Sequence, residues 1–150
     1  MANVARPAAV DWLNGTVERF AALSTISLVF NLGYFIWIVN KSAEDFDLAP
    51  LGQVLVLDHL MFIGVMTNAI FALMAVAAGA RRELMPWANT VIAAAVNIGL
   101  AGFIVGLLSD VEICFQISTS IMGDGILLGI LVFTLRLQSS ASPTAAEATS

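Results

Sequence analysis

The sequence is poor in the residues from which most enzyme and nucleic-acid sites are built. Its 150 residues include one histidine and one cysteine, and only 11% of them are charged. One cysteine excludes a disulfide or a thiolate cluster within the chain, and one histidine excludes the paired histidines of a zinc protease. Six basic against eleven acidic residues give no support for nucleic-acid binding. A glycine-rich phosphate loop and a nucleophile elbow are also missing.

Long apolar runs dominate what is present. Hydrophobic residues make up 59% of the chain, whereas soluble domains contain about 45–50%. They gather in four runs, each as long as the roughly 20 residues that cross a bilayer. We therefore predict an all-α, four-helix transmembrane bundle. Its helices are expected at about 20–39, 52–78, 86–108 and 111–137, and short connections make neighbours antiparallel, in up-down-up-down order.

The predicted helices divide the chain into three parts. Residues 1–19 form a polar segment in the cytoplasm or at the membrane interface, and residues 20–137 form the transmembrane domain. Residues 138–150 are small and polar and are expected to be disordered. We expect no cleaved signal peptide, because the first apolar run is span-length and no cleavage motif is evident before it.

The basic residues fall almost entirely on one side of the predicted membrane. Five arginines lie on one side: Arg6, Arg19, Arg81, Arg82 and Arg136. Lys41 alone lies on the opposite side. Because lysine and arginine in short loops stay in the cytoplasm, both termini and the 79–85 loop are predicted to be cytoplasmic. We expect a multi-pass protein of the inner (plasma) membrane.

Four polar residues lie near the middle of the predicted spans, one on each helix. They are Asn31, Asn68, Asn97 and Asp124. Polar groups in hydrocarbon are costly, so each needs a partner or a function. A bundle could bring the four together as one polar layer that fixes helix packing through hydrogen bonds. Alternatively, the layer could belong to a proton or small-solute conduit centred on Asp124.

Glycines recur along the last two predicted helices. Gly102 and Gly106 form one pair at four-residue spacing, and Gly125 and Gly129 form another. Small residues at this spacing allow helix backbones to approach closely in membranes. The pattern predicts tight packing and indicates no particular chemistry.

His59 lies close to the outer end of the second predicted helix, with Phe62 and Met66 expected on the same face. A neutral imidazole on an apolar helix face is what an axial heme ligand requires. The alternative is a hydrogen bond to a polar residue near the outer end of the fourth helix: Asp110, Glu112 or Gln116. A sulfur atom could supply a further ligand of the heme iron, and the candidates are Cys114, Met61, Met66 and Met122. Buried cysteine and methionine side chains more often fill gaps in the packing.

The segment LGQVLVLDHLMFIGVMTNAIF, residues 51–71, resembles the second helix of heme–copper oxidase catalytic subunits and their nitric-oxide-reductase relatives. In that family a histidine near the outer end of this helix ligates the low-spin heme, and an apolar, glycine-containing stretch ending in an aromatic follows it. The matching positions here are His59, Phe62, Gly64 and Phe71. The basic turn at 81–86 also resembles the family's cytoplasmic connection.

The resemblance extends to the helix count. The family's catalytic subunit has twelve helices in three arcs of four, with ligand histidines on the second helix of each arc. This chain looks like one such arc, and a homo-oligomer, most naturally a trimer, would rebuild the ring. The copper-site histidines and the second axial heme histidine have no counterpart here, so oxygen reduction is not implied.

The resemblance therefore implies a small b-type cytochrome-like protein that binds heme b through His59 and is not an oxygen reductase on its own. Electron transfer or heme or gas sensing would be its role. The second axial ligand would come from His59 of another copy or from a methionine, or would be missing. Two alternatives stay open: a structural or accessory subunit of a membrane complex, and the conduit centred on Asp124.

Overall fold

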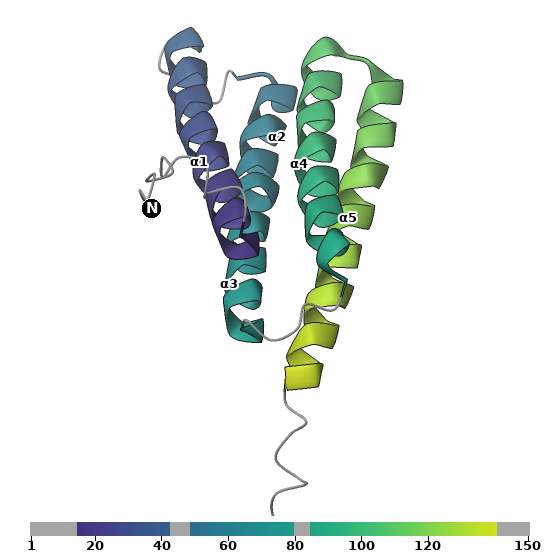
Figure 1. The fold of residues 1–150 in the computed structure, drawn as a ribbon. Coiled ribbons are helices and arrows are strands. Elements are labelled where there is room, and N and C mark those ends of the chain that lie inside the picture. The colour runs from purple at the N-terminus through teal and green to yellow at the C-terminus, as the bar shows by residue number, and fades with distance from the viewer. Residues whose placement is uncertain (1–14, 43–48, 80–84, 141–150) are drawn as a thin grey trace, which may run out of the picture.

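Four long helices make up the part of the chain that the computed structural model describes, residues 15–42, 49–79 and 85–140 (Figure 1). Each helix is long and apolar enough to cross a membrane. The chain passes up and down alternately, as the colour gradient in Figure 1 shows. The predicted all-α, four-helix transmembrane bundle is thus confirmed, whereas the cytoplasmic position of the termini stays a prediction.

The second span is not a single α-helix, because a π-helical segment interrupts it. The elements in chain order are α1 (Thr16–Lys41), α2 (Leu51–His59), η3 (Leu60–Thr67), α3 (Asn68–Ala78), α4 (Pro86–Ser109) and α5 (Glu112–Ser140). The predicted boundaries are close, but α1 begins four residues before the predicted Phe20. Its first turn takes in Glu18, whose charge favours a helix N-terminus.

The connection between α4 and α5 is as short as the sequence predicts. Asp110 adopts a left-handed conformation, with φ of 56°, and ends α4. The Val111 N–H then donates to the Gly106 carbonyl at 3.0 Å, as in the common glycine-ended helix terminus. At the other end, Pro86 occupies the first turn of α4, where its missing N–H costs nothing.

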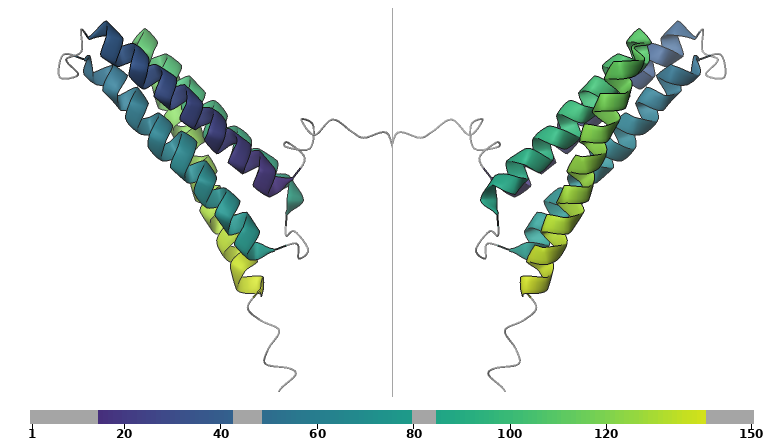
Figure 2. Two further views of the ribbon diagram at one scale, coloured as in Figure 1. Left: turned by 90° about the vertical axis from the view of Figure 1, so that its left-hand side faces the viewer. Right: turned by 90° about the vertical axis from the view of Figure 1, so that its right-hand side faces the viewer.

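The helices form two antiparallel hairpins packed against each other. α1 packs along η3 and α3, and α4 packs along α5. The hairpins meet where α3 contacts α5 and where α2 contacts α4. In the two side views α1 is nearest in one and α5 is nearest in the other (Figure 2), so these two helices lie on opposite sides of the bundle. Among the described residues, one face of α5 therefore has no neighbouring helix.

Glycines hold α4 and α5 together at close range, as their spacing predicts. A Cβ added at Gly99 would lie 2.8 Å from the Met122 backbone nitrogen, and one at Gly106 would lie 2.6 Å from that of Phe115. Hydrophobic burial gives little drive in lipid, so close packing of this kind supplies much of the helix association. The backbones of α4 and α5 can come this close only because these positions carry no side chain.

Three phenylalanines join the hairpins in the half of the bundle that contains the chain's first helical turn. Phe20, Phe71 and Phe133 are almost fully buried. Their ring centroids are 5.5–6.1 Å apart, with two edge-on contacts and one stacked contact. Such aromatic pairs add to stability beyond simple burial. The cluster fixes how α1, α3 and α5 converge.

Candidate functional site

His59 is the last residue of α2 and is half-buried. Its Nδ1 lies 2.8 Å from the Leu55 carbonyl oxygen, one turn earlier in the same helix. Since a carbonyl only accepts hydrogen bonds, Nδ1 must carry the hydrogen, and in the neutral ring Nε2 then keeps a free lone pair. The partner is therefore a backbone carbonyl, and not Asp110, Glu112 or Gln116.

An aromatic ring from α4 covers one face of this imidazole. The ring centroids of His59 and Phe103 are 4.2 Å apart and the planes differ by 25°. Phe103 in turn contacts Phe115 of α5, with centroids 5.0 Å apart. His59 is thus packed into the contact between the hairpins. It does not line the apolar cavity of about 350 Å³ that lies between α1 and α4.

The structure does not bring Phe62 and Met66 onto the inner face with His59. Their side chains are 60% and 43% exposed on the outside of the bundle. The cause is η3, in which hydrogen bonds span five residues and each turn is wider than in an α-helix. Ile63 and Gly64 turn inward instead, and Gly64 is buried against Ser27 of α1.

Side chains from α1 bond directly to the carbonyls of the second span. Asn31 Nδ2 donates to the Leu57 carbonyl at 2.8 Å, and Ser24 Oγ donates to the Val65 carbonyl at 2.9 Å. Thr67 Oγ1 donates to Phe62, five residues back, at 3.0 Å. Irregular helix is tolerated in lipid only where its backbone groups find such partners. The sequence gives no signal for the π-helix beyond these donors.

Two of the four polar residues that could form a layer do meet. Asn68 and Asn97 exchange two hydrogen bonds, with Nδ2–Oδ1 distances of 3.0 and 3.1 Å. Asn68 Nδ2 also donates to the Gly64 carbonyl in η3, and Asn97 Nδ2 donates to the Ala93 carbonyl in α4. The two amides thus form the kind of interhelical hydrogen bonds that hold transmembrane helices together.

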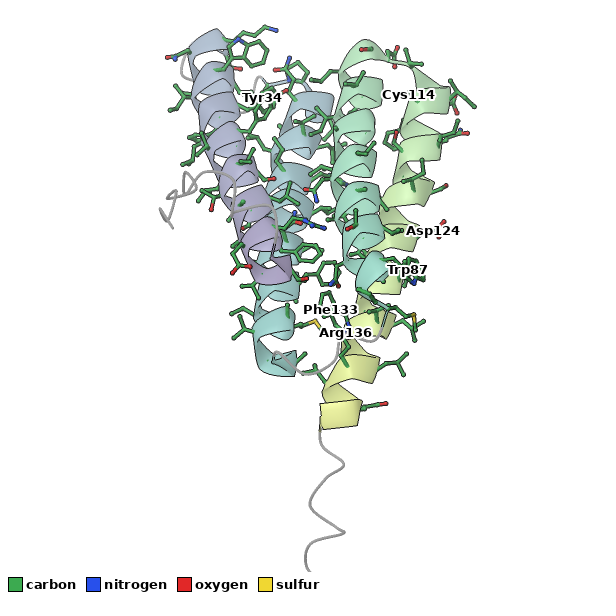
Figure 3. The ribbon with its side chains drawn as sticks, viewed as in Figure 1. Tyr34, Trp87, Cys114, Asp124, Phe133 and Arg136 are labelled. Atoms are coloured by element: carbon green, nitrogen blue, oxygen red, sulfur yellow. The ribbon has the colours of Figure 1, made fainter. Side chains whose placement is uncertain are left out.

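Asp124 does not join this pair. It lies near the middle of α5, is exposed, and points away from the other helices (Figure 3). The inward side of α5 is taken by its neighbour Gly125, which packs against Ala95 and Val96 of α4. Asn31, which bonds to Leu57, is the other residue separated from the amide pair. Within one chain, the polar residues therefore form no single layer.

The sulfur candidates are spread over the bundle. Cys114 is half-buried, and its thiol donates to the Gly102 carbonyl of α4 at 3.4 Å. Met122 is buried in the core, whereas Met61 is 41% exposed. In the described part of the chain, no three histidine, cysteine or acidic side chains cluster closely enough to hold a metal ion.

The outward face of α5 carries polar and small residues that sequence reasoning did not connect. Exposed Gln116, Ser120 and Asp124 follow one another at steps of four residues, and exposed Thr119 lies beside them. A Cβ added at Gly123 would meet nothing within 4 Å, unlike one at most other glycines of α4 and α5. The four-residue spacing of Gln116, Ser120 and Asp124 indicates in the sequence that they share one face of the helix.

A buried arginine network near the end of α5 was also missed. Arg136 is 7% exposed, and its Nη1 and Nη2 donate to Asn89 Oδ1 at 2.7 Å and to the Met85 carbonyl at 3.1 Å (Figure 3). Asn89 continues the network to Thr16 of α1 at 2.7 Å. Arg136 thus ties three helices together. The loop arginines used for the orientation lie outside the described residues: Arg6, Arg81 and Arg82.

Comparison with known proteins assigns no family to the chain. His59 and the outward face of α5 are consequently interpreted from their own contacts. No protein-family model matches the sequence, and no curated protein or solved structure shows significant similarity to it.

Proposed function

We propose that the chain is a non-enzymatic subunit of a larger membrane assembly, joined to it along the outward face of α5. The observation that carries this proposal is the exposed Asp124, in the middle of a membrane-spanning helix. An aspartate at the centre of a transmembrane helix costs about 3 kcal/mol on insertion scales, and such residues almost always face protein or water. A neighbouring protein surface would remove this cost.

The remaining outer surface supports the same proposal by contrast. Exposed residues on the other spans are largely apolar, for example Val29 at 65%, Leu73 at 68% and Ile98 at 68%. These surfaces suit direct contact with lipid tails. The outward face of α5 is different, because an amide, two hydroxyls and a carboxyl group occur there within nine residues, 116–124.

The mass of the intact particle tests the proposal. The protein would be extracted from its own membranes in lipid nanodiscs and weighed by native mass spectrometry. We expect particles that contain more than one polypeptide, and we expect Asp124→Leu to release the 15.9 kDa chain, because leucine tolerates lipid. The control Ile98→Ala alters an exposed α4 residue and should leave the particles intact. A wild-type protein that is monomeric in nanodiscs would contradict the proposal.

Binding of heme b through His59 is a second candidate function, and one observation favours it. A histidine that ligates a metal through one nitrogen usually donates from the other to a carbonyl or carboxylate, as Nδ1 of His59 does toward Leu55. Phe103 stacks on one face of the ring, whereas the Nε2 lone pair lies in the ring plane; Phe62, which the resemblance places beside the heme, points outward. The described residues thus offer a ligand nitrogen without the neighbouring Phe62 ring that the resemblance implies.

The visible spectrum tests this candidate directly. Heme binding predicts a Soret band in protein purified from heme-replete cells, a shift of that band on reduction with dithionite, and its loss in His59→Ala. The control Met61→Leu changes an exposed residue near His59 and should leave the band unchanged. A colourless preparation would remove the candidate and leave the assembly proposal untouched.

A further inference from the structure

The outward face of α5 contains a regular seam. Its members follow at alternating steps of four and three residues: Gln116, Ser120, Gly123, Leu127, Ile130 and Thr134. Leu127 and Ile130 are 67% and 50% exposed, Gln116, Ser120 and Thr134 are also exposed, and Gly123 is open on its outer side. This 3.5-residue repeat is the spacing of a left-handed coiled coil.

We propose that a second copy of this chain covers the seam, with the two α5 helices packed parallel about a two-fold axis along the membrane normal. The inference rests on the proposed function and names the partner. Copies inserted by the same route share one orientation in the membrane, and a two-fold axis then sets each seam residue opposite itself. Every polar residue of the seam thereby meets a polar residue at its own depth.

The hydrogen-bonding groups of the face are complementary to themselves. Gln116 has an amide that can both donate and accept, and one of its N–H groups already bonds to Glu112 at 2.9 Å. Paired across the axis, the two amides would fix the register, as a single buried amide does in coiled coils. The hydroxyl of Ser120 donates to the backbone carbonyl of Gln116 at 3.1 Å. If one copy's hydroxyl turns from this carbonyl, it can donate to the Ser120 oxygen of the other copy.

Asp124 flanks the seam and acquires a partner in this arrangement. Asp124 directly follows the core residue Gly123, and Thr119 directly precedes the core residue Ser120. In a parallel two-stranded coiled coil, flanking residues at these two positions face each other across the interface. Asp124 would thus lie beside Thr119 of the second copy. The Thr119 hydroxyl now donates to its own Phe115 carbonyl at 2.7 Å and can turn to the carboxyl group instead. Two like carboxylates need not face each other.

The small residues of the seam permit the approach that such a contact requires. Ser120 and Gly123 lie at consecutive core positions, where short side chains let helix backbones come close in lipid. Below them, Leu127 and Ile130 supply apolar surface for packing. Among the described residues, Arg136 is buried, the half-buried Arg19 lies in the first turn of α1, and Lys41 is the last residue of α1, so no exposed basic side chain lies at this depth. Self-pairing by hydrogen bonds therefore suits the face better than an ion pair between copies.

Disulfide cross-linking in native membranes tests the inference. In a Cys114→Ser background, Ser120→Cys and Leu127→Cys place thiols on the seam, whereas Ile121→Cys places one beside it on the same helix, 42% exposed before substitution. Because disulfides need Cβ atoms about 4 Å apart, we expect oxidant to yield covalent dimers for the two seam variants only. Adding Gly123→Leu should lower the dimer yield about tenfold.

Each other result has a definite meaning. Equal cross-linking at Ser120→Cys and Ile121→Cys would indicate random collision and overturn the inference. Absent self-cross-linking, combined with native particles that contain a different membrane protein, would overturn the second copy and leave the proposed assembly standing. Absent cross-linking together with monomeric particles would overturn both.

Discussion

Asn68 and Asn97 form a closed pair of amide hydrogen bonds across the contact between α3 and α4, at 3.0 and 3.1 Å. The pair is the polar centre of the bundle. Both residues also bond to carbonyls of their own spans, so the two amides are held in one orientation. Removal of either side chain deprives the other amide of both hydrogen bonds across the contact.

We expect Asn68→Ala and Asn97→Ala each to lower the free energy of unfolding by about 1–2 kcal/mol, because interhelical hydrogen bonds in membranes are worth roughly 1 kcal/mol. The double variant should cost less than the sum, with a coupling energy of about 0.5–1 kcal/mol. Denaturant unfolding in mixed micelles measures all three. Additive losses would show that the two side chains do not interact.

The glycines of α5 and α4 separate packing inside the chain from the outward face. Gly99→Ala places a Cβ 2.8 Å from the Met122 nitrogen, and we expect it to lower monomer stability by about 1–3 kcal/mol. Gly123→Ala is the matched control, because its Cβ meets nothing within 4 Å. It should leave monomer stability unchanged or raise it by up to about 1 kcal/mol through helix propensity. Similar losses for both variants would contradict the assignment of faces.

Arg136 should be among the most sensitive positions at its end of the bundle. Arg136→Leu leaves Asn89 Oδ1 and the Met85 carbonyl without this donor, and we expect a loss of about 2–4 kcal/mol. Arg136→Lys keeps the charge but not the forked geometry, so an intermediate loss is expected. The exposed Gln138 on the same helix serves as control, and Gln138→Leu should change the unfolding free energy by less than about 0.5 kcal/mol.

Asp110 tests the tight turn between α4 and α5. Its φ of 56° lies in the region that glycine adopts without cost. Asp110→Gly should therefore raise the unfolding free energy by up to about 1 kcal/mol, whereas Asp110→Val, with a branched Cβ, should lower it by at least as much. Thermal unfolding followed by circular dichroism measures both. A valine variant as stable as wild type would mean that the turn adopts another conformation.

The spans and their packing glycines were predictable because each leaves a direct mark in the sequence. Apolar runs of span length define the four helices, Pro86 marks the start of α4, and Ser109–Asp110 mark the turn before α5. The spacing of Gly102 and Gly106 predicted the close contact between α4 and α5. In the structure, a Cβ at Gly106 would clash with the Phe115 backbone. These features depend on local composition and spacing alone.

The rotation of each helix was not predictable, because transmembrane helices are apolar on nearly every side. The sequence allowed Asp124 to join the asparagines in one layer, but Gly125 and the buried Met122 take the inner face of α5. η3 then turns Phe62 and Met66 outward, away from the half-buried His59. The stretch 60–67 contains only one polar donor to its own carbonyls, Thr67, and among the described residues the other side-chain donors to this segment are Asn68 of α3 and Ser24 of α1.

Oxygen accessibility of a nitroxide on α5 measures most directly whether protein or lipid covers its outward face. In a Cys114→Ser background, labels at Ser120→Cys and at Ile98→Cys lie within about one helical turn of the same depth, because Gly99 packs against Met122. We predict that oxygen, which concentrates in the lipid, collides several-fold less often with the α5 label than with the α4 label. Equal collision rates at the two positions would contradict the proposed assembly.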